Sequence, residues 1–388
     1  MEFRFTEEQQ MIRDTAEAFL AEVSTPAAVR EAMVTERGYS EALWQQISQE
    51  MMWPALHIPE AFGGLGLGFV ELAAMQEQMG RTLLCAPFLS TVGFAVNALL
   101  VAGSEAQQSH YLGEIASGKT ATLAFMAPGS RPDADAIQAT CAADGDGFLL
   151  NGEYRYVLDG HTADILVLAA RDPGSAGTAG VSLFVLPADT AGISRQWLPT
   201  MDQTRRQARI VLDKVRVEGD ACMGAAGQAW PALAKILDLA TVALAAEQVG
   251  VAQQSLDSSV AYTTERVQFG RTIASYQAIK HKAADMMLKV EAARSAAYYA
   301  ACIADEALAG RPLGSGLAEA ASIAKAYCSE AAFFNAGCGI QLHGGVGITA
   351  EYDIQLYFKR AKSTETLLGD AAWHRERLAR QLLDGGVA

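Results

Sequence analysis

Glu247 is the residue whose type and surroundings point most directly to chemistry. It lies in the segment 239–250, LATVALAAEQVG, where most neighbours are apolar. Moving an ionised carboxylate from water into apolar surroundings is costly unless the charge is paired or used. Glu247 is therefore predicted to be either a general base tuned by burial or a structural carboxylate. In the second case its partner is a lysine or arginine across a helix bundle or a subunit interface.

Two further places could bind an anionic ligand. Arg266 is followed closely by Phe269 and Gly270. An arginine presents a planar fork of N–H donors that binds phosphate oxygens in pairs, and a glycine lets the backbone approach a ligand closely. Near the C-terminus, Gln341 precedes the pair Gly344-Gly345, which could bring backbone amides against a ligand. The alternatives are an ordinary surface arginine and a glycine that ends a helix.

Short motifs of several other enzyme classes are absent. The sequence contains no HExxH, Walker A or GxSxG motif, and neither of its glycine-rich segments, 62–68 and 343–347, fits G-x-G-x-x-G after a strand. None of the six cysteines forms a C-x-x-C pair. A zinc enzyme, a thioredoxin-like protein and a Rossmann dinucleotide site are therefore not supported, and no metal site is expected.

Composition predicts a folded chain of two or three domains. It has 388 residues, of which 51% are hydrophobic and 19% charged, with a net charge of −14. Such acidity argues against nucleic acid or an anionic membrane surface as the main partner. The start is unlike a secretion signal, and no apolar run approaches the roughly 18 residues of a membrane helix. Scattered cysteines then predict a cytoplasmic protein with reduced thiols.

The elements that must position these residues change character twice along the chain. Residues 1–120 carry helical spacing, with Thr6 and Gln9 forming a predicted capping box. Residues 121–225 contain short β-type runs separated by turns such as Asn151-Gly152, and residues 226–388 return to long helices. The predicted strands are 120–126, 137–142, 148–150, 154–158, 165–170, 181–186 and 208–217, and the predicted long helices are 230–262, 275–308, 316–336 and 353–362.

These patterns predict an α+β protein of three domains. We expect an N-terminal helical domain over 1–120, a central small antiparallel β-barrel or sandwich over 121–225, and a C-terminal four-helix bundle over 226–388. The segment 374–380, HRERLAR, is expected to be a solvated amphipathic helix end.

Five segments, in order, resemble the acyl-CoA dehydrogenase family. They are IPEAFGGLGLG (58–68), AFMAPGSRPD (124–133), GFLLNGEYRYVLDG (147–160), TERVQFGRTIASYQAIKHKAADM (264–286) and QLHGGVGITAEYDIQLYFKRAK (341–362). The resemblance spans most of the chain. It implies bound FAD, an acyl-CoA thioester substrate, α,β-dehydrogenation, and transfer of electrons to an electron-transferring flavoprotein.

The resemblance also implies site residues. Phe125, Met126, Tyr156 and Leu158 match positions that line the flavin ring, although packing in the β-domain core is an equal alternative for them. Arg266, Phe269 and Gln277 match positions that bind FAD. In the family, the segment containing Gln341, Gly344 and Gly345 reaches the FAD of a neighbouring subunit. It therefore implies an oligomer: a homodimer, a homotetramer or a heteromer with a related chain.

The sequence departs from the family at the catalytic base. Many members use a glutamate near the C-terminus, and here Leu368 occupies that position. A second family position for the base is Ala240. Glu247 lies seven residues beyond Ala240, on the same helix face and about 10 Å along it, which would suit a bulky or branched acyl group. Asp370 is the next candidate base, at a position where the family has a flavin-contacting threonine.

Three functions follow from this pattern. The leading one is FAD-dependent dehydrogenation of an unusual, bulky acyl-CoA, such as a sterol-derived thioester. A second is an oxygen-using flavin reaction on the same fold, of the nitroalkane oxidase or hydroxylase type. A third is a non-catalytic or half-site subunit of a heteromeric dehydrogenase, in which the partner chain supplies the base.

Overall fold

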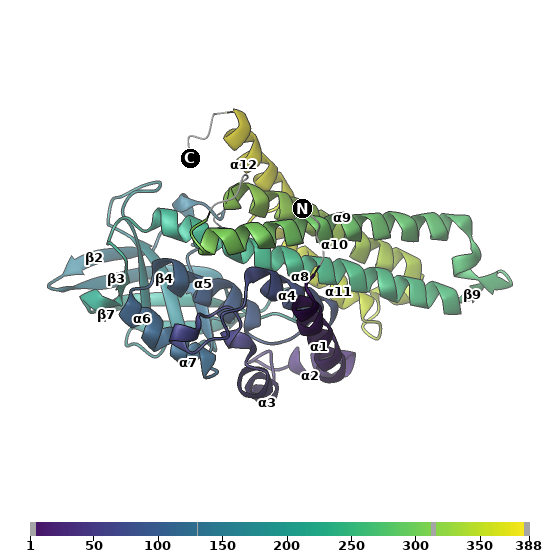
Figure 1. Cartoon of the computed structure of the whole chain (residues 1–388), viewed down its shortest axis with the longest axis horizontal. Coiled ribbons are helices and arrows are strands. Elements are labelled where there is room, and N and C mark those ends of the chain that lie inside the picture. Colours follow the sequence, from purple (N-terminus) through teal and green to yellow (C-terminus); the bar gives the residue numbers. More distant parts are fainter. Residues whose placement is uncertain (1–4, 130, 312–315, 384–388) are drawn as a thin grey trace. The chain divides into compact units, whose positions relative to one another are not determined.

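A computed structural model describes residues 5–129, 131–311 and 316–383 of the chain (Figure 1). The chain divides into two compact units. The helical unit comprises Met1–Glu31, Phe69–Leu84 and Thr241–Ala388, and the sheet unit comprises Ala32–Gly68 and Cys85–Ala240. Among the described helices, none combines the length and apolarity that a membrane crossing requires.

The sheet unit is built on one eight-stranded sheet with the order β6-β7-β3-β2-β4-β5-β8, and β1 pairs with β4. Most neighbours are antiparallel, as predicted, but β1–β4 and β2–β4 are parallel. The β6 and β8 strands were not predicted. The strands are β1 (Ala121–Ala124), β2 (Thr140–Asp144), β3 (Gly147–Leu158), β4 (Ile165–Arg171), β5 (Val181–Pro187), β6 (Ile193–Leu198), β7 (Gln207–Val217) and β8 (Cys222–Met223).

The β3 strand replaces two predicted strands and the turn expected between them. Asn151-Gly152 is an irregularity in the register of β3 with β7, not a hairpin. Gly152 has φ +146°, and a Cβ there would lie 2.6 Å from the Cα of Ala139. A second irregularity, between Tyr154 and Val157, contains Tyr156 at φ +60°. Such bulges redirect side chains within a continuous strand.

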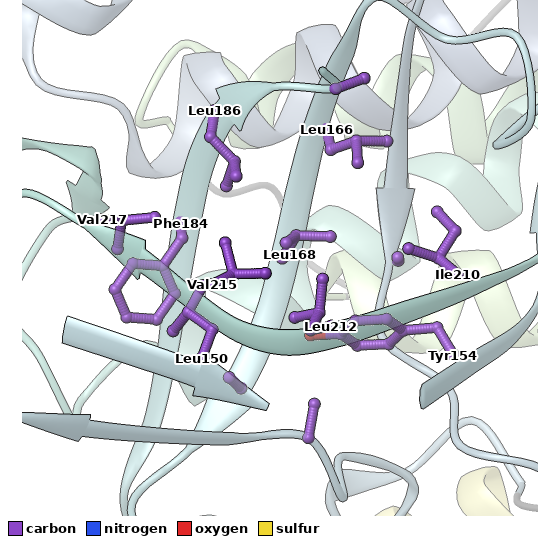
Figure 2. Close-up of a cluster of buried hydrophobic side chains, with 14 of the residues drawn as sticks. Leu150, Tyr154, Leu166, Leu168, Phe184, Leu186, Ile210, Leu212, Val215 and Val217 are labelled. Carbon is purple, nitrogen blue, oxygen red and sulfur yellow. The ribbon is translucent and has the colours of Figure 1, made fainter. Parts of the chain in front are cut away.

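A hydrophobic core fixes this sheet. Tyr154 is buried with its hydroxyl donating to the Ala169 carbonyl at 3.0 Å. The other large members come from β3, β4, β5 and β7, and Figure 2 shows them gathered between these strands: Leu150, Leu166, Leu168, Phe184, Leu186, Ile210, Leu212, Val215 and Val217. Burying each such side chain stabilises the fold by about 1.5–3 kcal/mol.

Shorter helices complete the sheet unit, and Trp44 ties one of them to a turn, with its indole N–H donating to the Gly118 carbonyl at 2.7 Å. These helices are α3 (Glu41–Gln45), α5 (Asn97–Ala102), α6 (Glu105–Gln107) and α7 (Gly113–Ala116).

The helical unit contains the four long helices that periodicity predicted, and a fifth, α12, that the sequence indicated only as a solvated end. The capping box of Thr6 and Gln9 at the start of α1 is confirmed. The helices that lie wholly or mostly in this unit are α1 (Glu7–Val23), α2 (Pro26–Ala32), α4 (Phe69–Arg81), α8 (Trp230–Glu265), α9 (Gln277–Leu308), α10 (Leu317–His343), α11 (Ile354–Thr366) and α12 (Ala371–Leu383). A small hairpin of β9 (Val267–Gln268) and β10 (Arg271–Thr272) follows α8.

Candidate functional site

Glu247, on α8, is buried and ion-paired. Its Oε1 atom lies 3.0 Å from Nη1 of Arg360, on α11, and both side chains are at most 2% exposed. The pairing is the structural alternative that the sequence left open, and the partner lies 113 positions away along the chain. A catalytic role for Glu247 stays a prediction.

A close crossing of α4 with α8 fixes the backbone of Glu247. A Cβ added at Gly80 would lie 2.1 Å from the Glu247 carbonyl oxygen. A Cβ added at Gly250 would lie 1.9 Å from the Glu77 carbonyl oxygen. Each helix therefore uses a glycine where the other helix's backbone touches it, since no real Cβ packs this closely.

A second buried carboxylate, Glu77, lies at the same crossing and was missed by sequence reasoning. It accepts hydrogen bonds from Nε and Nη2 of Arg294, each at 3.1 Å, and from the Tyr298 hydroxyl at 2.8 Å. Arg294 also donates to Gln253 on α8 at 2.7 Å. Glu77 thus links α4 with α8 and α9 through a network in which each of these hydrogen bonds joins residues more than forty positions apart in the chain.

Asp370, the other candidate base, begins α12. Its Oδ1 atom accepts a hydrogen bond from the Trp373 backbone N–H at 2.8 Å, which is the geometry of an N-cap. The preceding residues turn sharply: Leu368 has φ +60° and Gly369 has φ +96°. Leu368, at the family's base position, is 3% exposed. The exposed carboxylate of Asp370 has a structural role, and its catalytic role remains untested.

Two buried side chains hold this turn, and the sequence did not indicate either. The Lys325 ammonium donates to the carbonyls of Glu365 and Gly369, at 3.0 and 2.8 Å. His374 Nε2 lies 3.0 Å from the Leu368 carbonyl, and Nδ1 lies 3.2 Å from the Ser322 hydroxyl. Because a carbonyl only accepts, Nε2 carries the proton and Nδ1 accepts from the hydroxyl.

Burial lowers the pKa values of both Lys325 and His374. Burial lowers the pKa of Lys325 to about 7. Burial, reinforced by the positive charge of Lys325, lowers the pKa of His374 to about 3, so the imidazole is neutral. The expectation that 374–380 is solvated is therefore wrong for His374, which is 1% exposed. The sequence feature that could have indicated the buried Lys325 is a lysine within the mostly small-residue segment 320–332.

The predicted FAD residues of the helical unit lie at exposed helix ends. Arg266 follows α8, Phe269 is 93% exposed at the tip of the β9–β10 hairpin, and Gln277 begins α9. The ends of α8 and α10 lie side by side, because Tyr262 stacks on His343 with ring centroids 4.3 Å apart.

That stack brings two predicted cofactor segments near each other in the helical unit. Gln341 is exposed in the last turn of α10, and Gly344 closes the helix at φ +66°. A Cβ at Gly344 or Gly345 would meet no atom within 4 Å. Open glycine backbone and an exposed arginine are each suited to the phosphates of FAD, which need N–H donors and close approach.

The predicted flavin-ring residues of the sheet unit lie in the segment that follows β1 and in β3. The Met126 carbonyl accepts from the Arg155 backbone N–H at 3.0 Å, so the segment just after β1 lies against β3. Phe125 and Leu158 are buried, whereas Tyr156 is 46% exposed. Burial alone leaves both alternatives open for Phe125 and Leu158, whose flavin contacts stay predictions, and the irregular part of β3 leaves the Tyr156 side chain partly accessible.

Comparison with known proteins identifies the family. Three domains match in order: the acyl-CoA dehydrogenase N-terminal domain over residues 6–119, the middle domain over 122–215 and the C-terminal domain over 227–383. The chain belongs to the acyl-CoA dehydrogenase family. The resemblance seen in the sequence is thereby confirmed, and the protein is an FAD-dependent oxidoreductase.

Individual relatives support the same assignment. "Acyl-CoA dehydrogenase IpdE2" of Mycobacterium tuberculosis is 35% identical over 362 residues, 93% of each chain. Butyryl-CoA dehydrogenase of Megasphaera elsdenii has a structure with TM-score 0.90 and 25% identity, covering 99% of this chain and 100% of that one. The Tcur3481–Tcur3483 steroid ACAD variant has TM-score 0.86 and 30% identity over 98% of this chain and 99% of its own. The predicted α+β fold class is thus confirmed.

Proposed function

We propose that this chain catalyses the FAD-dependent α,β-dehydrogenation of a bulky acyl-CoA thioester, sterol-derived or branched, and passes the electrons to an electron-transferring flavoprotein. The observation that carries the proposal is the buried Leu368 in the turn before α12, at the family's usual base position. The similarity to a steroid ACAD supports the substrate class. Similarity to a structure from work on the electron-transferring flavoprotein of Acidaminococcus fermentans, with TM-score 0.91 and 29% identity over 99% of this chain, supports the electron acceptor.

The exposed N–H groups of the chain hold the cofactor in this proposal. In the helical unit, the Arg266 guanidinium and the backbone amides around Gly344 are the proposed donors to phosphate oxygens of FAD. In the sheet unit, the partly exposed ring of Tyr156 is the proposed contact of a flavin ring. Bound FAD supplies the acceptor for the β-hydride of the thioester. The α-proton leaves to a base of the protein, because a thioester α-proton is only weakly acidic.

Glu247 is the proposed base. It is one of two carboxylates at the α4–α8 crossing, and the positive charge of Arg360, 3.0 Å away, compensates its own. A base about two helical turns beyond Ala240, the second family position for the base, leaves more room for the acyl group.

The Glu247→Gln variant tests this role. We expect it to retain flavin, because Glu247 is not among the predicted cofactor contacts, and to lose substrate-dependent bleaching of the flavin absorbance. The matched control is Glu77→Gln, which removes the other carboxylate of the crossing and should keep bleaching. Near-normal turnover in Glu247→Gln would overturn the role. Flavin content and the melting temperature of both variants separate loss of chemistry from loss of fold, since breaking a buried pair costs about 3–5 kcal/mol.

A second candidate is a half-site subunit of a heteromeric dehydrogenase. The ion pair of Glu247 with Arg360 favours it, because a carboxylate that serves α8 and α11 as a structural partner leaves the chemistry to another chain. The ChsE4–ChsE5 complex of Mycobacterium tuberculosis, with TM-score 0.87 and 26% identity over 98% of this chain, is a solved complex of two named chains. Oxygen consumption during turnover would instead favour the nitroalkane oxidase or hydroxylase type of reaction.

A further inference from the structure

Lys325 is buried, and within the described part of the chain its ammonium donates hydrogen bonds only to backbone carbonyls. It lies on α10 with 0% exposure, and its ammonium donates to the Glu365 and Gly369 carbonyls. Glu365 lies in the last turn of α11, where unpaired carbonyls carry partial negative charge. A cation there closes the end of the helix, so Lys325 acts as a C-cap supplied by a neighbouring helix.

The turn that Lys325 contacts is strained. Leu368 adopts φ +60°, a left-handed conformation that costs a residue with a side chain about 1–2 kcal/mol. Gly369 follows at φ +96°, and a Cβ there would lie 2.6 Å from the ring of Trp373. Strained backbone persists only where its surroundings hold it in place.

His374 completes the restraint. Its Nε2–H donates to the Leu368 carbonyl at 3.0 Å, and the Ser322 hydroxyl, one turn before Lys325 on α10, fixes the other ring nitrogen. The carbonyls of Glu365, Leu368 and Gly369 are thus all bound by two buried side chains. The charged or titratable groups around them are Cys328, Glu365, Asp370 and Arg377.

We propose that Lys325 is a positioning residue that, together with His374, holds the 367–370 turn in the shape the acyl-CoA reaction requires. This inference rests on the proposed function, because the family resemblance places the turn beside the reacting carbons. Neither side chain touches substrate in this view; each acts through the backbone that presents Leu368 and Asp370. Burying a lysine without a carboxylate partner is costly, which favours a role beyond packing.

The test uses Lys325→Met in the flavin-loaded protein, with Asn335→Leu as the matched control. Asn335 lies on the same helix with 0% exposure and also donates to two backbone carbonyls, those of Ala252 and Met286, at 3.1 and 3.2 Å. Each variant loses two buried hydrogen bonds, but only Lys325 donates to a carbonyl of the 367–370 turn. The measurements are hydrogen–deuterium exchange of peptides covering 363–374, flavin content, and kcat and KM with the best acyl-CoA found for the wild type.

We expect Lys325→Met to raise the exchange rate of the 363–374 peptides about tenfold, because losing the stability of about one hydrogen bond makes local opening about tenfold more frequent. We also expect kcat to fall about tenfold, with KM changed by no more than about threefold. Lys325→Gln keeps two N–H donors and should restore most of both. Equal exchange and equal kcat in Lys325→Met and Asn335→Leu would overturn the proposal.

Failure of the proposed function gives a different result. If no acyl-CoA bleaches the wild-type flavin, the dehydrogenase proposal fails, and exchange alone then decides whether Lys325 holds the turn. If either variant loses its fold, His374→Phe, which removes the hydrogen bond to the Leu368 carbonyl, is compared with Asn335→Asp in the same way.

Discussion

Asp305 shows at the scale of one residue how a distant side chain can begin a helix. Its carboxylate on α9 accepts hydrogen bonds from the backbone N–H groups of Phe69 and Val70, the first two residues of α4. Burial raises the pKa of Asp305 to about 6, more than the two N–H donors lower it. Sequence spacing offers no reason to join residues 236 positions apart, and it does not pair Glu247 with Arg360 either.

This raised pKa sets the sign of a pH effect. Between about pH 4 and 6 the folded state binds a proton at Asp305 that the unfolded state has lost, so this residue's contribution to stability falls as pH rises through that window and is constant above it. Asp305→Asn removes the effect. The rise in the pKa of Asp305 from 3.8 to about 6 corresponds to about 3 kcal/mol of stability over the whole window.

The measurement is the free energy of unfolding in urea at pH 4.5 and 7 for both proteins. We expect wild type to lose more stability than Asp305→Asn between the two pH values, by about 1–2 kcal/mol after partial exposure is allowed for. Parallel changes in the two proteins would contradict this account.

At the scale of elements, hydrophobic periodicity predicted most helices and strands correctly. Turn composition gave a wrong prediction in one place. The long helices α8, α9, α10 and α11 and six of the eight strands follow from residue spacing. Asn151-Gly152 has the composition of a hairpin turn, but pairing of β3 with β7 on both sides keeps the strand continuous. Register between strands is a tertiary property, so a dipeptide cannot decide it.

The crossing of α4 with α8 gives a prediction about glycine. Gly250→Ala should lower the free energy of unfolding by at least about 2 kcal/mol, because its Cβ would lie 1.9 Å from the Glu77 carbonyl oxygen and 2.8 Å from the Arg81 backbone nitrogen. Thermal melting of the flavin-loaded protein measures the change. The control is Gly337→Ala on α10, where the Cβ would meet only the Phe358 ring, at 3.9 Å. That variant should be neutral or stabilised by about 0.5–1 kcal/mol; a similar loss in both would refute the steric explanation.

For the whole molecule, the family resemblance identified the activity class, and the candidate site was only partly visible in the sequence. The domain boundaries at 120 and 225 and the cytoplasmic location stay predictions. The glycine and arginine segments at 266–270 and 341–345 could be chosen from sequence because their chemistry is local. Lys325 and His374 could not, because their burial depends on how α10, α11 and α12 pack.

Flavin content of the chain produced without any partner distinguishes the two candidate functions. We expect about one FAD per chain by absorbance if copies of this chain alone complete the cofactor site. Arg266→Ala should reduce this content without changing the melting temperature of the flavin-free protein, because the arginine is exposed. Arg271→Ala is the control: it removes a neighbouring arginine whose guanidinium lies 3.9 Å over the Tyr276 ring. A well-folded chain with no flavin would favour the half-site subunit.

The buried lysine under the 367–370 turn also makes folding a proton-releasing reaction. An unfolded chain keeps Lys325 fully protonated at neutral pH, with an ordinary pKa of 10.5, whereas burial brings the folded value to about 7. At pH 7 each molecule that folds therefore expels roughly half a proton from this one site. The release rises to nearly a full proton at about pH 9 and falls again toward pH 10.5, where the unfolded lysine also loses its proton, so a rise in pH through this range favours the folded state.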